Sequence, residues 1–283
     1  MDIKEYLEKR RKEINVALDE NLPKGKDMLS RAMRYNVLGA GKRLRPILVI
    51  AAAQMFGARQ EKAMLPACAI ELVHNFTLIH DDLPCMDNDD YRRGRLTLHN
   101  AYSEAIAVLA GDALLNLAFA VLVKGKGEVT PSIRIKLIEE VSNALGVYGL
   151  VGGQAKEISL RGQKLDLAAI EDIYMKKTAA LISAAIRFGA IIGKANKKEL
   201  ALLTSYGKHI GIAFQVMDDI LEFMNGEAER KQDELNYIFF TDLEKAREVT
   251  GKNIELAKKS LRYFGRRGEI LLGIADYIIN RNH

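Results

Sequence analysis

Two clusters of carboxylates lie far apart in the chain, and each interrupts a segment that is otherwise dominated by apolar residues. The clusters are Asp81, Asp82 and Asp87, and Asp218, Asp219 and Glu222. A soluble helix normally spreads its acids over a solvated face, so acids in apolar surroundings need a partner. Mg²⁺ prefers hard oxygen ligands and usually bridges them to a substrate phosphate. The two clusters therefore indicate a magnesium site that acts on a diphosphate.

The second cluster has the plainer geometry. Asp218 and Glu222 are four residues apart, so on a continuous helix both carboxylates lie on one face, while Asp219 is turned by one position. Gln215 lies about one turn earlier. A solvated patch is the alternative interpretation, but the mostly apolar residues 211–217 favour a cleft.

The first cluster contains a proline and is followed by arginines. Pro84 should disturb the helix after its first acids, which lets Asp87 converge with Asp81. Arg92 and Arg93 come shortly afterwards, and guanidinium groups bind phosphate bidentately. A charged loop balanced by its own arginines is the alternative interpretation.

A second basic group lies at residues 41–46, which contain Lys42, Arg43 and Arg45 and open an apolar helix. Backbone N–H groups at a helix start, together with three cations, make an anion site. His74 stands about two helical turns before the first acid pair, on the same predicted helix. Taken alone, a single histidine is more often structural.

Composition bounds the class of protein. The 283 residues are 48% hydrophobic, enough to bury a large core, and we expect a single domain over residues 1–283. The net charge of +5 comes from 42 basic and 37 acidic residues that are interspersed, which predicts a solvated surface and no nucleic-acid partner.

The cysteines and the N-terminus indicate the compartment. Cys68 and Cys85 form neither a metal-binding motif nor a disulfide framework, which favours a reducing cytoplasm. The N-terminus lacks the apolar stretch of a signal peptide, and no segment carries about 18 uncharged apolar residues. We therefore expect a cytoplasmic protein without stable membrane insertion.

The apolar residues recur at spacings of three and four, which predicts an all-α fold of about ten helices. Glycine or proline punctuates this pattern near residues 22–25, 39–41, 56–57, 124–127, 162, 193, 225–226 and 264–265. Residues 105–123 and 181–192 are apolar nearly all round and should be central helices of a layered bundle. Membrane spans are the alternative, and Asp112, Asn116 and Arg187 argue against them.

Taken together, these residues resemble the trans-isoprenyl diphosphate synthases, and the likeness runs over about residues 36–247. The motifs that carry it are, in chain order, residues 41–46, 81–87 with 92–94, 111–115, 152–154, 177–178 and 214–219. The resemblance implies a homodimer and a single large layered helical bundle around a deep apolar cavity, with the two acid-bearing helices facing each other across it. It also implies condensation of an allylic diphosphate with isopentenyl diphosphate.

The resemblance implies a role for each matching position. Three Mg²⁺ ions per site would be held on the allylic diphosphate by Asp81, Asp82, Asp87, Asp218, Asp219 and Glu222. The same diphosphate would contact Arg92, Lys177, Thr178 and Gln215, and isopentenyl diphosphate would contact Lys42, Arg45, His74 and Arg93. The catalytic residues would be Asp81, Asp82, Lys177 and Asp218.

The product length is predicted by residues just before the first cluster. A side chain one to two turns before Asp81 would project along the path of the growing tail. Phe76 occupies that position beside Thr77. Together with Pro84 and Cys85 inside the cluster, it resembles the bacterial farnesyl type and predicts a C15 product.

The chain departs from the family pattern at three places. Glu222 and Glu157 stand where aspartates are usual, and the segment 226–237 is short and lacks the family's lysine before Tyr237, for which Lys231 could compensate. Two rival functions follow. One is a terpene synthase of the same fold that acts without condensation and would not need Lys42, Arg45 and His74. The other is a non-catalytic subunit of a heteromeric synthase, which should tolerate loss of the metal ligands.

Overall fold

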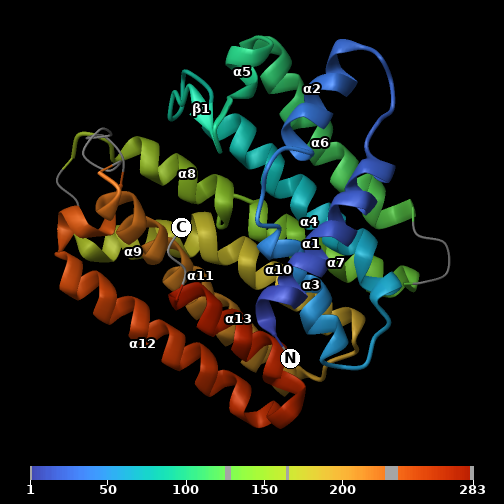
Figure 1. Ribbon diagram of the computed structural model, residues 1–283, viewed down its shortest axis with the longest axis vertical. Helices are drawn as coiled ribbons and strands as arrows, with labels where there is room; N and C mark the ends of the chain where they lie inside the picture. Colours follow the sequence, from blue (N-terminus) through green and yellow to red (C-terminus); the bar gives the residue numbers. More distant parts are fainter. Residues whose placement is uncertain (1, 125–128, 164–165, 227–234, 281–283) are drawn as a thin grey trace. The chain divides into compact units, whose positions relative to one another are not determined.

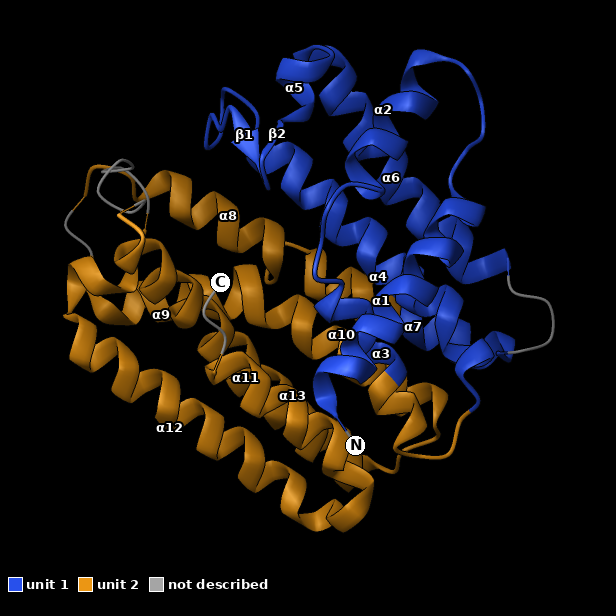
Figure 2. Ribbon diagram, viewed as in Figure 1, with its two compact units in different colours: residues 1–50, 59–138 blue, residues 51–58, 139–283 orange. Residues whose placement is uncertain are grey.

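The computed structural model describes residues 2–124, 129–163, 166–226 and 235–280 (Figure 1). It divides into two compact units, one formed by residues 1–50 and 59–138 and the other by residues 51–58 and 139–283 (Figure 2). Each unit is described by itself below. The single domain that the composition predicts over residues 1–283 stays a prediction.

The first unit is built on the packing of α4 against α6. Its elements are α1 (Ile3–Asn21), α2 (Met28–Val37), part of α3 (Leu44–Gln54), α4 (Gln60–Asp81), β1 (Tyr91–Arg92), β2 (Arg95–Leu96), α5 (Leu98–Ala101), α6 (Glu104–Lys124) and part of α7 (Pro131–Leu145). Helix α2 also packs on α6, and α1 packs on α4. Helix α4 ends inside the first acid cluster, so this packing positions that cluster.

The second unit is built around the long helix α11 (Lys197–Met224). Its other elements are the rest of α3 and α7, α8 (Leu150–Ser159), α9 (Leu167–Tyr174), the π-helix η1 (Met175–Ala179), α10 (Ala180–Ile192), the 3₁₀-helix η3 (Tyr237–Phe240), α12 (Leu243–Leu261), the 3₁₀-helix η4 (Arg262–Gly268) and α13 (Glu269–Ile279). Helix α11 packs against α10, α12, α13 and η1. It carries the second acid cluster, so these contacts set the orientation of those acids.

The all-α prediction is confirmed, and several helices end where the punctuation predicts. Helix α1 ends at Asn21 before Pro23, α10 ends at Ile192 before Gly193, and α11 ends at Met224 before Gly226. Only a two-residue antiparallel pair, β1 with β2, forms a sheet among the described residues. The 3.6-residue periodicity sufficed for the fold class because every long element buries one helical stripe or more.

Helix α10 is a central helix of its unit, as predicted. Every residue from Leu181 to Ile192 is buried except Arg187. That guanidinium makes a two-pronged ion pair with Glu140, with N···O distances of 2.6 and 2.5 Å, and donates to Thr204 Oγ1 at 2.6 Å. The hydrogen bonds that Arg187 donates to Glu140 raise the pKa of Arg187. The charge inside an apolar helix is therefore satisfied by neighbouring helices.

Helix α6 differs from the prediction that it is buried all round. Ala107, Gly111 and Leu114 are buried, but Val108 and Leu109 are 39% and 52% exposed. By length and composition α6 is the one helix of the described chain that could cross a membrane, a test that core helices also pass. Helix α6 therefore has two apolar faces. One packs inside the unit, and the other is exposed in the single chain.

One buried guanidinium ties four segments of the first unit together. Arg43 donates to Glu71 on α4 at 2.7 Å and to Asn15 on α1 at 2.8 Å, and the two charged residues are 3% and 2% exposed. It also donates to the carbonyls of Val37 and Gly39 at 2.6 and 2.9 Å. All three of its nitrogens donate, in four hydrogen bonds, and such partners are the condition for burying a charge.

Replacement of Glu71 by Gln should destabilise the protein by about 3–5 kcal/mol, because it leaves the Arg43 charge buried and uncompensated. Denaturant unfolding measures the change. The control is Glu248→Gln, which removes an exposed partner of Lys245 and should leave stability unchanged within error. Equal effects of the two variants would contradict the assignment of Arg43 as an organising charge.

Candidate active site

The first acid cluster lies at the end of α4, where the chain turns back on itself. Asp81 is the last residue of the helix, and its carbonyl accepts a 2.9 Å hydrogen bond from the backbone N–H of Asp87. Asn88 has a positive φ of 53° and donates its N–H to the carbonyl of Leu83 at 3.1 Å. The predicted return of Asp87 towards Asp81 is therefore present in the backbone.

A tight hairpin brings Arg92 back to the acids. Arg93 and Gly94, between β1 and β2, both have positive φ, 54° and 74°, as a two-residue hairpin turn of the mirror-image type requires. Arg92 then donates to Asp82 Oδ1 at 2.6 Å and to Asp89 Oδ2 at 3.0 Å. Burial raises the pKa of Asp82 to about 6, against the opposing charge of Arg92.

This pairing is what the charged-loop interpretation of the first cluster predicts, and it also holds a guanidinium beside the acids. Asp82 is 2% exposed, whereas Asp81 and Asp87 are partly exposed. A small pocket here is lined by Asp82, Arg92 and Arg93 among others. Because one side of that pocket is cationic, it can accept an anion next to the carboxylates.

The three cations around the start of α3 differ in burial, with Arg43 buried, Arg45 half-buried and Lys42 exposed. Arg43 has a positive φ of 52°, and its side chain points inward, where it makes the hydrogen bonds described above. The prediction of three cations for an anion is thus wrong for Arg43, because protein acceptors use its charge. Lys42 is exposed, and Arg45 Nη1 lies 3.3 Å from His74 Nε2.

Positive charges gather around His74. Burial lowers the pKa of His74 well below its usual value, and Arg45 and Arg93 lower it further. Arg93 is held nearby by a 2.8 Å hydrogen bond to the carbonyl of Ala40. The first unit therefore brings together three of the four residues predicted for isopentenyl diphosphate. The positive charge around them would favour a bound anion.

The predicted chain-length residues lie on α4. Phe76 is 8% exposed and makes an edge-to-face contact with His80, with 4.9 Å between ring centroids. Thr77 is buried and donates to the carbonyl of His74 at 2.9 Å. On α6, a Cβ at Gly111 would lie 2.2 Å from His80 Nε2, so glycine there leaves room for the His80 ring.

The second acid cluster presents its three acids differently. Glu222 is exposed and Asp218 is half-buried, whereas Asp219 is only 1% exposed. Tyr174 OH and the N–H of Tyr237, at 2.8 Å, donate to Asp219 Oδ2, and Gln215 Nε2 donates to Oδ1 at 3.1 Å. Burial raises the pKa of Asp219 to about 6. That Asp219 holds a metal stays a prediction, but in the structure protein donors occupy both of its oxygens.

Lys177 and Thr178 lie in the π-helix η1, which sits between two close glycines. A Cβ at Gly153 of α8 would lie 2.8 Å from the Lys176 Cβ, and one at Gly211 of α11 would lie 2.4 Å from the Ala179 Cα. Helices of ordinary side chains could not approach η1 so closely. The glycines therefore place the lysine and threonine directly against α8 and α11.

Both predicted side chains of η1 have partners from the motifs around them. Lys177 Nζ lies 2.9 Å from Glu157 Oε2, and Thr178 Oγ1 donates to Gln215 Oε1 at 2.7 Å. Glu157 replaces the usual aspartate, and its carboxylate contacts the lysine in this structure. The predicted side chains of Lys177, Thr178 and Gln215 thus form one polar cluster with Glu157 in the second unit.

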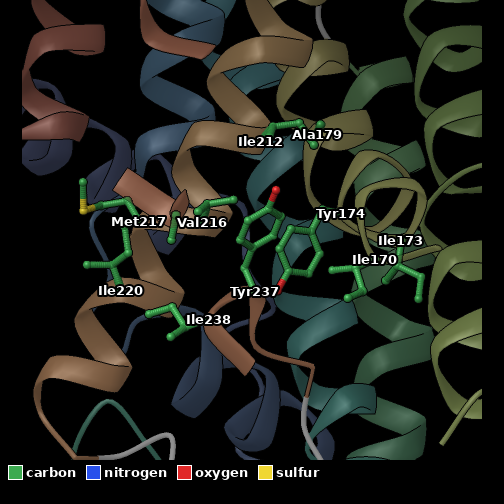
Figure 3. Packing of buried hydrophobic residues seen from close by; sticks show 11 residues of the cluster. Ile170, Ile173, Tyr174, Ala179, Ile212, Val216, Met217, Ile220, Tyr237 and Ile238 are labelled. Carbon is green, nitrogen blue, oxygen red and sulfur yellow. The ribbon is translucent and has the colours of Figure 1, made fainter. Parts of the chain in front are cut away.

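Sequence reasoning missed two buried polar residues of the second unit. Tyr174, three residues before Lys177, is 4% exposed and packs in the apolar cluster with Tyr237, Ile170 and Val216 (Figure 3). Gln154 was noted only as part of a motif. It is 5% exposed, and its amide oxygen and nitrogen have no hydrogen-bond partner among the described residues. A buried amide of this kind calls for an explanation, and a bound ligand would supply one.

The carboxylates of each unit, taken separately, fit Mg²⁺ that is shared with a substrate. No three His, Cys, Asp or Glu side chains of the described residues form a ready-made metal cage. Mg²⁺ usually takes one or two carboxylates and fills its remaining positions with water and phosphate oxygens. Asp81, Asp87, Asp218 and Glu222 are all partly or fully exposed hard-oxygen donors.

Of the departures from the family pattern, residues 227–234, which include Lys231, lie outside the described part of the chain.

Comparison with known proteins agrees with the geometry. The polyprenyl synthetase family pattern matches residues 26–250. A dimethylallyltranstransferase of Fischerella ambigua is 40% identical, covering 100% of this chain and 84% of that protein. A chloroplastic geranylgeranyl pyrophosphate synthase of Capsicum annuum is also 40% identical, covering 100% and 79%. The crystal structure of an FPP/GFPP synthase from Zymomonas mobilis superimposes with a TM-score of 0.90 at 38% identity, covering 98% of this chain and 99% of that one.

Replacement of Gly211 by Ala should destabilise the protein by about 1–3 kcal/mol, because the new methyl group would force η1 away from α11. It should also raise the KM for a diphosphate substrate, since Lys177 and Thr178 would move. Denaturant unfolding and steady-state kinetics measure the two effects.

The matched control is Gly251→Ala on α12, where an added Cβ has no neighbour within 4 Å. Alanine is the better helix former, so this variant should gain up to about 1 kcal/mol. If Gly211→Ala were as stable as the parent, η1 would not depend on the close approach.

Proposed function

Because the chain belongs to the polyprenyl synthetase family, we propose that it condenses an allylic diphosphate with isopentenyl diphosphate to form a longer prenyl diphosphate. The observation that carries the proposal is that the first unit brings the cations Arg45 and Arg93 together around His74. A cyclase that acts on one diphosphate has no use for a second anion site. The relatives named as synthases support the same conclusion.

In the proposed reaction, the C–O bond of the allylic diphosphate breaks and pyrophosphate leaves with the electron pair. Mg²⁺, when bound, would neutralise the charge that develops on the leaving group. Arg92, Lys177, Thr178 and Gln215 would hold that group in place, while Lys42, Arg45, His74 and Arg93 would orient isopentenyl diphosphate. The double bond of isopentenyl diphosphate then attacks the allylic carbon, and a proton is lost to the departing pyrophosphate.

Each acid cluster supplies metal ligands in this proposal. They would be Asp81, Asp82 and Asp87 in the first unit, and Asp218 and Glu222 in the second. Asp82 is paired with Arg92 in the structure, so metal binding there would require that ion pair to rearrange. Three ions per site is the number that the family resemblance supports.

The two free thiols, Cys68 and Cys85, support a reducing compartment such as the cytoplasm.

The direct test uses purified protein, Mg²⁺ and isopentenyl diphosphate with dimethylallyl, geranyl or farnesyl diphosphate in separate reactions. Products are identified by mass spectrometry before and after phosphatase treatment. A longer prenyl diphosphate is the expected result. Hydrocarbon or alcohol formed without isopentenyl diphosphate would support the terpene synthase alternative, and no turnover of any pair would support a subunit that needs a partner chain.

We further propose a C15 product, with Phe76 as the residue that stops elongation. Phe76→Ala should lengthen the product by at least one C5 unit, because the smaller side chain leaves room for the tail. The control is Phe264→Ala, which removes a ring of similar burial in the second unit. It should lower stability without changing the product length. Unchanged C15 output from Phe76→Ala would sink the proposal.

The exposed face of α6 supports the homodimer that the family resemblance implies. Val108 and Leu109 lie on this face with Ala105, which is also exposed. Leu109→Glu should therefore shift the protein from dimer to monomer in light scattering coupled to gel filtration. The matched control is Val16→Glu on α1, a 60% exposed apolar residue whose replacement should leave the mass unchanged. A monomeric parent protein would refute the dimer.

A further inference from the structure

Asp219 has an environment unlike that of the other acids in its cluster. Its carboxylate accepts hydrogen bonds from Tyr174 OH, from the backbone N–H of Tyr237 and from Gln215 Nε2. An ionised carboxylate has about four lone-pair positions, so three donors use most of them. With 1% exposure, the remainder is closed to water. These contacts describe an acid that organises protein groups.

We propose that Tyr174 is a positioning residue for the reaction, which holds Asp219 as a hydrogen-bond acceptor so that Gln215 and Thr178 meet the allylic diphosphate in one fixed orientation. This inference rests on the function proposed above. In this inference Asp219 positions other residues of the site and is not a metal ligand. Asp218 and Glu222, which are more exposed, remain the metal ligands of the cluster.

The direction of the hydrogen bonds explains how Tyr174 acts through Gln215. Ionised Asp219 can only accept, so the amide nitrogen of Gln215 must face it. The amide oxygen is then turned to Thr178, whose hydroxyl donates to it at 2.7 Å. If Asp219 rotated, nothing in this chain of contacts would prevent the amide from flipping. The flip would exchange an acceptor for a donor beside the diphosphate.

The surroundings of Tyr174 keep its hydroxyl in place. The residue is the last of α9 and runs directly into the π-helix that carries Thr178. Its ring lies 6.3 Å from that of Tyr237, within the apolar cluster of the second unit (Figure 3). The hydroxyl also lies 3.4 Å from the carbonyl of Leu235. A phenol fixed at both its ring and its oxygen can orient a carboxylate at little entropic cost.

Asp219 also anchors the chain that leads into η3, through its carboxylate and its backbone carbonyl. Asn236 Nδ2 donates to the carbonyl of Asp219 at 3.2 Å, and Asn236 Oδ1 accepts from the N–H of Ile238 at 3.0 Å. Together with the N–H of Tyr237, these bonds fasten the described end of the shortened segment to α11. Tyr174, Asp219 and Asn236 thus form one buried network that reaches η1 through Gln215.

The test compares Tyr174→Phe with a matched variant, Tyr206→Phe. Tyr206 is also fully buried and donates one hydroxyl hydrogen bond, to the carbonyl of Leu271 at 2.7 Å, away from the cluster. Both variants should lose similar thermal stability. Only Tyr174→Phe should raise the KM for the allylic diphosphate, by roughly tenfold, while the KM for isopentenyl diphosphate stays within about twofold. Equal rises in both KM values, or equal effects of the two variants, would overturn the proposal.

A double-mutant cycle tests the route of the effect. In a Gln215→Leu background, Tyr174→Phe should add little to the KM for the allylic diphosphate, because the two residues act in one chain of contacts. Additive effects would show that Tyr174 does not act through Gln215. The Mg²⁺ concentration for half-maximal rate should be the same for Tyr174→Phe and the parent. A decrease would mean that the variant frees Asp219 to bind metal in the working enzyme.

A binding measurement separates this inference from the proposed function. Calorimetry with an allylic thiolodiphosphate, which resists ionisation, should show a Kd about tenfold higher for Tyr174→Phe than for the parent or for Tyr206→Phe. If the parent binds the analogue but turns over no substrate pair, the proposed function fails while the comparison of the two tyrosine variants still decides the role of Tyr174. Equal Kd values for both variants would refute that role.

Discussion

A charge removed from water must be surrounded by hydrogen-bond partners, and the polar contacts of both units follow from this constraint. In the first unit the constraint is met at Arg43, whose guanidinium joins α1, α4 and the end of α2. In the second it is met at Asp219, whose carboxylate joins α9, α11 and η3. Each charge lies within a motif that also carries groups predicted to bind an anion or a metal. Satisfying the buried member fixes the chain at that point, and its neighbours are positioned as a consequence.

This arrangement explains why adjacent residues of one motif have different tasks. Lys42 is exposed while Arg43 is buried, and Asp218 is half-buried while Asp219 is closed to solvent. A motif recognised as a block of like charges therefore combines exposed groups with buried groups that hold the backbone. The buried members are the costly ones to remove, because their partners would be left unsatisfied.

The site also requires segments to approach one another closely, and glycines make this possible. Gly211 and Gly153 let α11 and α8 contact η1, and Gly111 admits His80 at the contact of α4 with α6. In each case the space that a methyl group would need is already occupied. These contacts place Lys177 and Thr178 beside Gln215 and Glu157, although the four residues come from three separate stretches of sequence. The polar cluster is thus a product of helix packing.

The sequence by itself determined the all-α fold, the ends of several helices, the family and the residue types of the site. These properties depend on local periodicity, on glycine and proline, and on short motifs, all of which can be read along the chain. Only the tertiary structure decided that Arg43 turns inward and that one face of α6 is exposed. It also decided that Tyr174 and Tyr237 donate hydrogen bonds to the carboxylate of Asp219. Those outcomes depend on which groups from distant segments lie within hydrogen-bond distance. A linear pattern carries no record of that distance, because burial and partner choice are settled by packing.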